Sequence, residues 1–401
     1  MSANNKVTIG VIGTGIMGPS DMTNLLNVED VEVAALCDVD DAQLAPALAT
    51  AEKRQSKMPD AYKDYRKLLE RKDIDAVVIA TPDHWHAIQF IHSAQAGKDI
   101  YIEKPLSHHI VETQAMVRAH RRYKRVVQVG TWQRSTGEFV QAIELVRGGT
   151  LGKVVHIRTW TTDSRNVGRK PITEPPKGLD YDAWLGPAQP QPYQSNVVHW
   201  GWRMRKNTGG ARTTDWGVHM IDIALLAMSK DQDIVMPHKV VASGGKWSAV
   251  NDDRDAPDSI DAIMTFPEHE FAMTWSVLRD HPGKPEHGIE WVFADGKTLR
   301  AWRGGIKLLD PDGKDLGVKK EPYGETGHWQ NFVDCIKSKE LPRSSLESMA
   351  RTTDVCHLAN VAVYSGEQIV WDSKKMDIVG KEGKDTWAYR RPYRKGYSLP
   401  S

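Results

Sequence analysis

VTIGVIGTGIMG, residues 7–18, decides the fold of this chain. A short Val- and Ile-rich run predicts a buried strand, and Gly13, Gly15 and Gly18 follow it in Gly-x-Gly-x-x-Gly spacing. That spacing is weak alone, but a strand before it and a helix-like stretch after it are the context that a dinucleotide-binding turn requires. We expect four residues of this turn to contact the dinucleotide: Gly13, Gly15, Ile16 and Met17.

The first third of the chain alternates strand-like and helix-like stretches. Further apolar runs lie at residues 31–38, 76–81, 99–103 and 125–130, with helix-like stretches between them that include 84–96 and 107–124. Near-continuous apolar strands with helical crossovers predict a parallel sheet covered on both faces. We therefore expect residues 1–130 to form a doubly wound α/β domain of the Rossmann type.

The pattern changes after residue 130. A helix-like stretch, a strand, a Pro-rich irregular stretch, meandering strands and two late helices are expected at 136–147, 153–162, 171–192, 238–310, 326–338 and 346–364. This order predicts a second, α+β domain over 131–401 with a large, mostly antiparallel open sheet. The basic, aromatic tail 380–401 is expected to be extended, and either disordered or clasping a neighbouring chain.

The bulk composition limits the class of protein. The 401 residues carry a net charge of +1 and are 40% apolar, which argues against nucleic acid or a membrane as the main partner. No apolar run approaches the roughly 18 residues of a membrane span. Three scattered cysteines form no disulfide framework or CxxC pair, so we expect a cytoplasmic location, with a periplasmic one open if a signal peptide has been removed. The 14 Trp against 6 Phe suit sugar stacking or ordinary cores.

Asp38 ends the strand expected at 31–38 and bears on the choice of dinucleotide. A carboxylate there accepts hydrogen bonds from ribose hydroxyls and repels a 2′-phosphate. The next residue is Val39 rather than an arginine. We therefore expect NAD, with NADP as the less favoured cofactor.

TPDHWH, residues 81–86, lies at the carboxyl end of the strand expected at 76–81. Ligands of doubly wound sheets bind beyond that edge, so we expect Thr81, Pro82, His84 and His86 to line the cofactor site. The alternative is that the two histidines are merely polar residues at a helix start. No acidic or Cys partner is paired with them in the sequence, and we expect no metal site.

YIEKP, residues 101–105, ends at the same edge one strand further on. The strand and Pro105 would place the Lys104 amine where a nicotinamide should lie, with Glu103 to orient it or balance its charge. Oxidising an alcohol needs a proton acceptor beside the hydroxyl, a task for which this lysine is suited. The alternative is an exposed surface ion pair of little consequence.

NTGGARTTDWGVHMID, residues 207–222, predicts a helix with an internal polar stripe. Asp215, His219 and Asp222 recur at helical spacing beside an apolar stripe. A carboxylate and an imidazole at i and i+4 suit proton transfer, although a surface-exposed pair would show the same spacing.

These motifs together resemble the glucose-fructose oxidoreductase, inositol 2-dehydrogenase and rhizopine catabolism (Gfo/Idh/MocA) family. The resemblance rests on GVIGTGIMG, CD at 37–38, TPDHWH, EKPLS, GGARTTDWGVHMID and HWQNFVDCIKSKELP, and spans nearly the whole chain. It implies an NAD-dependent oxidoreductase acting on a sugar, polyol or glycoside, and a homo-oligomer, dimer or tetramer, often formed through the open sheet. It also implies that Lys104 is catalytic, with His219 as acid or base beside Asp215.

The resemblance departs from the family pattern at one point and leaves the substrate open. The usual three glycines before the helix are GGA followed by Arg212, which can reshape the pocket. As walls of the substrate site we expect Arg134, Trp160 and Arg203 beside Asp215 and His219; the alternative for the first three is packing or surface charge.

Three functions remain open on the sequence. The first is reversible NAD-dependent oxidation of a secondary hydroxyl, with hydride transfer to nicotinamide and proton handling by Lys104 and His219. The second is NAD-dependent glycoside cleavage through transient C3 oxidation and elimination, with recycling of the cofactor. The third is a non-catalytic sensor, against which the intact lysine, aspartate and histidine argue.

Overall fold

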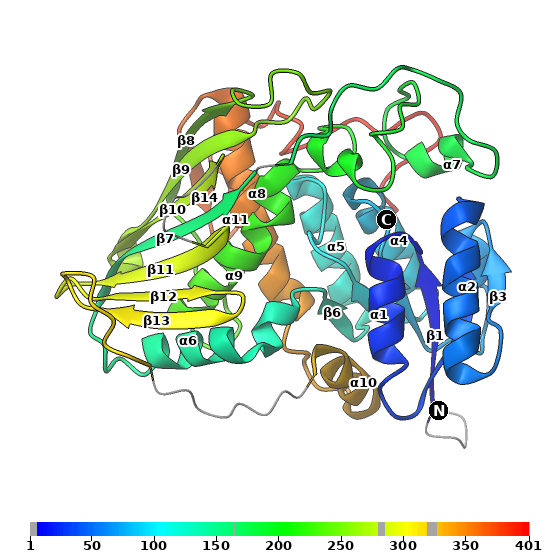
Figure 1. Ribbon diagram of the computed structural model, residues 1–401, viewed down its shortest axis with the longest axis horizontal. Helices are drawn as coiled ribbons and strands as arrows, with labels where there is room; N and C mark the ends of the chain where they lie inside the picture. Colours follow the sequence, from blue (N-terminus) through cyan, green and yellow to red (C-terminus); the bar gives the residue numbers. More distant parts are fainter. Residues whose placement is uncertain (1–5, 164, 280–284, 319–326, 401) are drawn as a thin grey trace.

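Six parallel strands form the N-terminal sheet of the protein, in the order β3-β2-β1-β4-β5-β6 (Figure 1). The computed structural model describes residues 6–163, 165–279, 285–318 and 327–400; residues 326 and 401 of the expected helix and tail lie outside them. The strands are β1 (Val7–Ile12), β2 (Val31–Cys37), β3 (Asp60–Tyr62), β4 (Ala76–Ile79), β5 (Asp99–Ile102) and β6 (Val127–Val129). The predicted doubly wound domain is confirmed.

Helices cover both faces of this sheet, as the near-continuous burial of β1, β4 and β5 requires. They are α1 (Met17–Leu25), α2 (Asp41–Gln55), α3 (Tyr65–Leu69), α4 (Asp83–Gln95) and α5 (Ile110–Tyr123). The edge strand β3 and the one-turn helix α3 were not expected, because the polar sequence DAY carries no apolar pattern. The turn before α1 and the loop before α4 meet at the carboxyl edge of the strands.

The second sheet has nine strands in the order β13-β12-β11-β7-β10-β9-β8-β14-β15. Its only parallel pair is β7 with β10, so the predicted mostly antiparallel sheet is confirmed. The strands are β7 (Val154–Thr162), β8 (Lys239–Gly245), β9 (Ser259–Phe266), β10 (Phe271–Leu278), β11 (His287–Phe293), β12 (Thr298–Trp302), β13 (Gly305–Leu309), β14 (Ile369–Asp372) and β15 (Asp377–Ile378). One face packs on helices and the other stays open, which gives β9 its strict alternation of buried and exposed residues.

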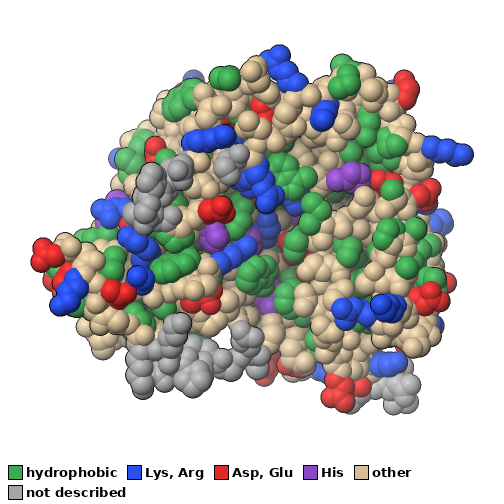
Figure 2. Space-filling model, viewed as in Figure 1, with side chains coloured by type: hydrophobic (Ala, Val, Ile, Leu, Met, Phe, Trp, Pro, Cys, Tyr) green, Lys and Arg blue, Asp and Glu red, His purple; other side chains and the backbone are tan. Residues whose placement is uncertain are grey.

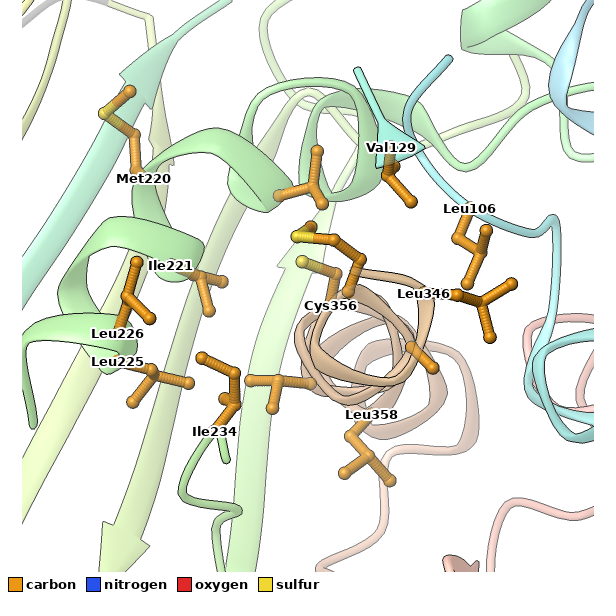
Figure 3. Packing of buried hydrophobic residues seen from close by; sticks show 14 of the residues in the cluster. Leu106, Val129, Met220, Ile221, Leu225, Leu226, Ile234, Leu346, Cys356 and Leu358 are labelled. Atoms are coloured by element: carbon orange, nitrogen blue, oxygen red, sulfur yellow. The ribbon is translucent and has the colours of Figure 1, made fainter. Parts of the chain in front are cut away.

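A single long helix, α11 (Leu346–Ser365), joins the two domains into one core (Figure 3). Leu346, Cys356 and Leu358 of this helix lie between Leu225 of α9 (Gly217–Met228) and Leu106 of the first domain. The remaining helices are α6 (Gly137–Arg147), α7 (Tyr181–Leu185), α8 (Ala211–Asp215) and α10 (His328–Ser338), with 3-10 turns η1 (Trp132–Ser135), η2 (Gly201–Met204) and η3 (Pro267–His269).

Parts of the expected second domain, 131–401, pack on the first domain. Phe332 and Ile336 of α10 belong to the same core as β1, β2 and β4. The C-terminal tail is irregular, as expected, but its own chain holds it: the Arg391 guanidinium donates to the carbonyl oxygen of His84 at 3.0 Å, and the Tyr393 hydroxyl donates to Glu112 at 2.5 Å. The alternative of a disordered tail is therefore wrong for residues 387–399. None of the helices in the described ranges is both long and apolar enough to span a membrane.

A buried ion pair fixes the junction between the domains. The Arg134 guanidinium of η1 donates to both carboxylate oxygens of Asp222 of α9, at 2.7 and 2.5 Å, and both side chains are 1% exposed. The hydroxyls of Ser348 and Thr352 of α11 complete the network at 2.9 and 3.0 Å. Three elements therefore share one set of charged hydrogen bonds in the interior.

Asp222→Ala should lower the free energy of unfolding by about 3–5 kcal/mol, because it leaves the Arg134 charge buried without a partner. Urea unfolding followed by circular dichroism measures the change. Glu347→Ala, which breaks the exposed pair with Arg121, is the control and should cost about 1 kcal/mol or less. Equal losses in the two variants would contradict the assignment.

Candidate active site

The glycine turn after β1 leaves room for a pyrophosphate at the start of α1. A Cβ on Gly13, whose φ is +90°, would lie 2.8 Å from the backbone of Ala80 and Thr81, and one on Gly18 would lie 1.9 Å from the carbonyl oxygen of Gly13. A Cβ on Gly15 would meet nothing within 4 Å. Two glycines thus permit close packing, and the third keeps free space in front of the helix, where backbone amides attract phosphate. The turn fits a dinucleotide.

A cavity of about 360 Å³ extends from this turn along the carboxyl edge of the first sheet. This volume is in the usual range of ligand pockets. Ten of the residues expected from the sequence line it: Gly13, Gly15, Ile16, Met17, Asp38, Thr81, Pro82, Glu103, Lys104 and Arg203. Figure 2 shows basic, acidic and histidine side chains gathered near the middle of the molecule, between the two domains.

Asp38 forms a fixed acidic wall at the far end of the cavity. Its carboxylate accepts hydrogen bonds from the Thr14 amide at 2.7 Å, the Thr14 hydroxyl at 3.1 Å and the Asp40 amide at 2.9 Å. Burial raises the pKa of Asp38, and these hydrogen bonds oppose the rise. Two basic residues at this end are already paired, Lys63 with Asp41 and Arg66 with Asp64. The wall therefore suits the two ribose hydroxyls of NAD better than a 2′-phosphate.

Aromatic residues of the second domain roof the cavity. Trp184, Trp202 and Tyr397 line it opposite the glycine turn. The irregular segment that carries the first two is tied to the first domain by backbone hydrogen bonds, from Asp180 N to Val39 O and from Asp41 N to Gly178 O, both 3.0 Å. These aromatic residues were not predicted to line the cavity, because an irregular Pro- and Trp-rich stretch has no periodicity from which the direction of its side chains can be read.

His84 and His86 do not line the cavity, in contrast to the expectation. Both are fully buried, and each ring lies between two backbone carbonyl oxygens: Trp184 and Thr208 for His84, Thr81 and Pro105 for His86. Burial lowers the pKa of both rings, to about 3 for His84. These histidines are positioning residues that connect the loop before α4 to the second domain and to the segment after Lys104.

Lys104 and Asp215 meet across the domain junction at the inner end of the cavity. The Lys104 ammonium donates to the Asp215 carboxylate at 2.7 Å and to the Asp215 carbonyl oxygen at 3.0 Å. Arg203 and Arg212 contact the same carboxylate at 3.4 and 3.2 Å. Burial opposes ionisation of Asp215, but the three cations hold its pKa far below the ordinary value. Asp215, rather than Glu103, is therefore the partner of the lysine.

Glu103 lies beside this cluster as a buried carboxyl group. Its Oε1 atom has no hydrogen-bond partner among the described residues, and a Cβ on Gly130 would lie 2.2 Å from that atom. Burial raises the pKa of Glu103 to about 7, against the pull of the Lys104 charge. Burial thus favours the protonated form of this carboxyl group more than water does.

His219 lies one helical turn beyond Asp215, on α9. Its ring is 5.9 Å from that of Trp216 and 6.5 Å from that of Trp132, and its Nδ1 atom is buried without a hydrogen-bond partner. Burial, then the charges of Lys104 and Arg303, hold the pKa of His219 well below its ordinary value. A neutral imidazole beside a lysine–aspartate pair can accept a proton. Asp222, which the helical spacing grouped with this pair, instead contacts Arg134.

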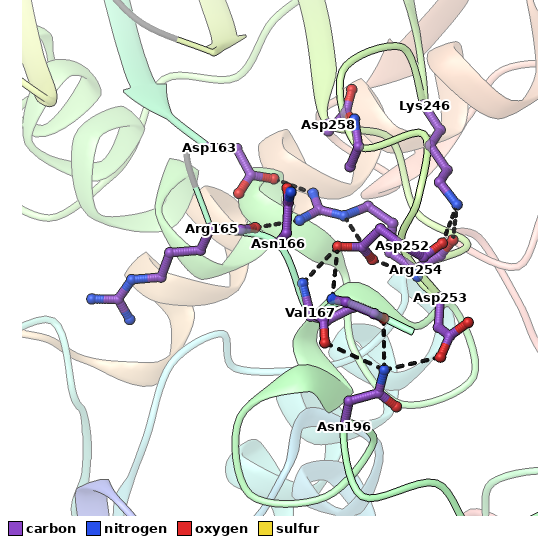
Figure 4. Close-up of polar contacts among 12 residues, drawn as sticks. Asp163, Arg165, Asn166, Val167, Asn196, Lys246, Asp252, Asp253, Arg254 and Asp258 are labelled. Carbon is purple, nitrogen blue, oxygen red and sulfur yellow. Dashed lines mark hydrogen bonds and ion pairs between the residues drawn. The ribbon is translucent and has the colours of Figure 1, made fainter. Parts of the chain in front are cut away.

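Arg212 is held by a network behind the site, of which Figure 4 shows the contacts of Asp163, Arg254 and Asp252. Its Nε donates to Asp163 at the end of β7, at 3.2 Å, and Asp163 is also paired with the buried Arg254. Asp252 in turn accepts from Arg254 N at 2.8 Å and from Val167 N at 2.6 Å. The network joins Asp163 and the segment 165–168 to the segment 246–258 and aims Arg212 at Asp215.

The residue before Arg212 has an unusual backbone. Ala211 has a φ of +57°, a conformation that glycine adopts freely and alanine does not. The alanine that replaces the third glycine is therefore accommodated with local strain at the start of α8.

Two expected substrate residues lie elsewhere. Arg134 is buried and donates to Asp222, Ser348 and the carbonyl oxygen of Arg343 in the interior. Trp160 is 2% exposed, and its indole nitrogen donates to the carbonyl oxygen of Pro285 at 2.9 Å. Neither lines the cavity. Trp132, Trp216, His287 and Arg303, which surround His219, were not singled out as site residues, because they come from four separate elements with no common motif.

Comparisons with known proteins place the chain. The family model described as "Oxidoreductase family, NAD-binding Rossmann fold" matches residues 7–131, and the one described as "Oxidoreductase family, C-terminal alpha/beta domain" matches residues 153–399. A glycosyl hydrolase family 109 protein of Shewanella sp. is 32% identical over 154 residues, which are 37% of this chain and 34% of that protein. The match to this curated relative thus spans about a third of its length.

Solved structures share the fold. An NAD-binding protein from Listeria innocua superposes with a TM-score of 0.68 at 19% identity, covering 91% of this chain and 97% of that one. A levoglucosan dehydrogenase in complex with NADH and levoglucosan gives 0.66 at 18% identity, covering 91% and 99%. With both family models matched in sequence order over most of its length, the chain belongs to the Gfo/Idh/MocA family of NAD-binding oxidoreductases.

Proposed function

We propose that the protein oxidises a secondary hydroxyl of a sugar, polyol or glycoside with NAD. The observation that carries the proposal is that Lys104, which lines the inner end of the dinucleotide cavity, pairs with Asp215 of the second domain. His219 lies one helical turn further along, close enough for the Lys104 charge to lower its pKa. A cation, a carboxylate and a neutral imidazole in one place are the groups that alcohol oxidation needs for its proton.

The charge of each site residue determines its role in the reaction. NAD, when bound along Gly15 and Asp38, supplies the hydride acceptor. Lys104 stabilises negative charge that develops on the hydroxyl oxygen, because its ammonium is fixed by Asp215. His219, whose low pKa favours the neutral imidazole, accepts the hydroxyl proton directly or through the lysine. Asp215 is the positioning residue, since it holds three cations in place.

Lys104→Ala and His219→Ala should each lower kcat by about a hundredfold or more, because each removes a proton-handling group. Both variants should still bind NAD, measured by calorimetry, because the glycine turn and Asp38 are untouched. Lys153→Ala, at an exposed surface pair with Glu270, is the matched control and should retain wild-type turnover. Full turnover in both site variants would defeat the proposal.

The pH dependence of the oxidation rate should reflect the ionisation of His219. The imidazole must be neutral to accept a proton, and its pKa lies well below the ordinary 6.5 because of burial and nearby positive charge. The rate of oxidation should therefore hold as pH falls past 6.5 and decline only at lower pH, when the ring becomes protonated. Two carboxyl groups near Lys104 also ionise near neutrality, Asp83 with a pKa of about 8 and Glu103 with a pKa of about 7, so the acid limb of kcat/KM in the Asp83→Asn/Glu103→Gln variant isolates the histidine. A midpoint at or above pH 6.5 would count against this role.

Glycoside cleavage with recycling of NAD is the second candidate. Two observations favour it: a glycosyl hydrolase family 109 protein among the relatives, and the roof of Trp184, Trp202 and Tyr397 over the cavity, which would retain the cofactor. The route needs the same groups: hydride leaves C3, a base removes the acidified C2 proton, the C1 substituent departs, and the hydride returns after water adds.

Incubation of the protein with free sugars and with 4-nitrophenyl glycosides separates the two candidates. Net oxidation should give a steady rise of NADH with both kinds of substrate and no nitrophenol. Nitrophenol release without accumulation of NADH would establish the cleavage route instead. His219→Ala should abolish whichever signal appears, whereas Lys153→Ala should not change it.

We further propose a homo-oligomer formed through the open face of the nine-stranded sheet. Val241 and Ile263 are paired on adjacent strands of that face and are 40% and 48% exposed. Exposed apolar pairs on a sheet face are typical of contacts between chains.

A further inference from the structure

Arg303 lies in a niche formed by Trp132, Trp216 and Gln133, near His219. It lies in the turn between β12 and β13, and its guanidinium carbon is 4.4 Å from the ring centre of Trp132 and 4.5 Å from that of Trp216. Nε and Nη2 both donate to the amide oxygen of Gln133, at 3.2 and 2.9 Å. Two indole faces and one amide thus fix the plane of the guanidinium and leave Nη1 without a partner among the described residues.

This guanidinium forms no ion pair within 4 Å with a carboxylate of the described residues. The charges of Asp215 and Glu138 reach it only at longer range, and Glu138 accepts a hydrogen bond from Gly304 N at 2.8 Å. Burial lowers the pKa of Arg303 to about 10, so it stays charged at neutral pH. A partly desolvated cation that is satisfied only by neutral groups is costly, and such a site is completed by an anion.

Unsatisfied polar atoms surround the same niche. His219 Nδ1, His287 Nε2 and Gln133 Nε2 are buried without hydrogen-bond partners among the described residues. The rings of Trp216 and His287 are 4.4 Å apart, and Trp216 also contacts the ring of His219. These atoms are the hydrogen-bonding groups expected around a polar ligand.

The charge around the niche is positive overall. Lys104, Arg203 and Arg212 share the carboxylate of Asp215, while Asp163 and Asp252 behind them pair with Arg212 and Arg254; with Arg303, five cations thus face these three carboxylates. Burial raises the pKa of Glu103 and Asp83, the other carboxyl groups near Lys104, and so favours their neutral forms. The phosphates of NAD bind at the glycine turn, at the opposite end of the cavity, and cannot balance this excess. The group that remains to balance this positive charge is the substrate.

We propose that Arg303 binds an anionic substituent of the sugar, so that the preferred substrates are sugar acids or their glycosides rather than neutral sugars. The inference rests on the proposed function for the reaction of the bound sugar, whereas the binding of the anionic group does not depend on that function. The free Nη1 edge meets the anion, and His219, one ring away across Trp216, faces the hydroxyl to be oxidised. Carboxylate and phosphate monoester share the required chemistry.

The test compares matched neutral and anionic sugars. NADH formation is followed with glucose, galactose and mannose, with their uronic acids and with their 6-phosphates, and nitrophenol release with 4-nitrophenyl glucosides and glucuronides. One class of anionic sugar should exceed its neutral parent in kcat/KM by about 20-fold or more, as expected for a charged hydrogen bond. Which class does so identifies the anion.

Arg303→Gln should reduce that preference to near unity, mainly through KM, and Arg303→Lys should leave an intermediate preference because it keeps the charge but loses the planar fork. Lys307→Gln removes one charge from the same hairpin, at an exposed pair with Asp315, and should leave the preference intact. Equal turnover of neutral and anionic sugars by the wild type, or an unaltered preference in Arg303→Gln, would overturn the inference.

Titration calorimetry of the NADH-loaded protein with glucose, glucuronate and glucose 6-phosphate keeps the two proposals separable. Tighter binding of an anionic sugar that Arg303→Gln abolishes, without turnover of any substrate, would retain the subsite and refute the reaction. Turnover of neutral sugars with no preferential binding of anionic ones would retain the reaction and refute the subsite.

Discussion

The contact of the Lys104 ammonium with the Asp215 carboxylate, 2.7 Å long, is the interaction on which the site depends. It crosses from the edge of a parallel sheet to a helix of the second domain, and both side chains are largely buried. A charge in such a place needs its partner, because removal of either one leaves the other desolvated. The surrounding elements serve this contact: α11 holds the domains in one core, and the Arg134–Asp222 pair fixes α9 below it.

The distribution of charge gives the site its direction. Asp38 makes the ribose end of the cavity acidic, whereas Lys104 and Arg203 make its inner end basic, with Arg212 and Arg303 nearby but outside the cavity lining. Burial, and then the charges of Lys104 and Arg303, hold the pKa of His219 below its ordinary value and favour the neutral imidazole. Positive charge near His219 lowers the pKa of its imidazole, and the same charge favours the binding of an anion. The acid–base chemistry and the choice of substrate therefore follow from one electrostatic arrangement.

The sequence predicted the parts of the molecule that local chemistry determines. The strands around Gly13, Asp38 and Lys104 were expected because apolar runs and a glycine turn leave few alternatives, and the structure places these residues on one cavity. Asp215 and His219 were expected from helical spacing and a family motif. Asp222, His84 and His86 lie outside the cavity, although their positions in the sequence suggested a place in an internal polar site or a cofactor site. A polar residue near a helix start can serve as a ligand or can hold two parts of the interior together, and only tertiary contacts decide between these roles. Trp202, Tyr397 and Arg303 come from irregular segments or a hairpin turn, where no periodicity tells which way a side chain points.

The roof over the cofactor cavity has a consequence for synthesis on the ribosome. Gly13 and Tyr397 line one cavity but stand near opposite ends of the sequence, and Arg391 anchors the segment that carries the tyrosine. The glycine turn emerges early, whereas Tyr397 follows every strand and helix of the second domain. A nascent polypeptide therefore lacks an enclosed nucleotide pocket until both domains have been synthesised, and a product truncated before Arg391 would lack one wall of that pocket.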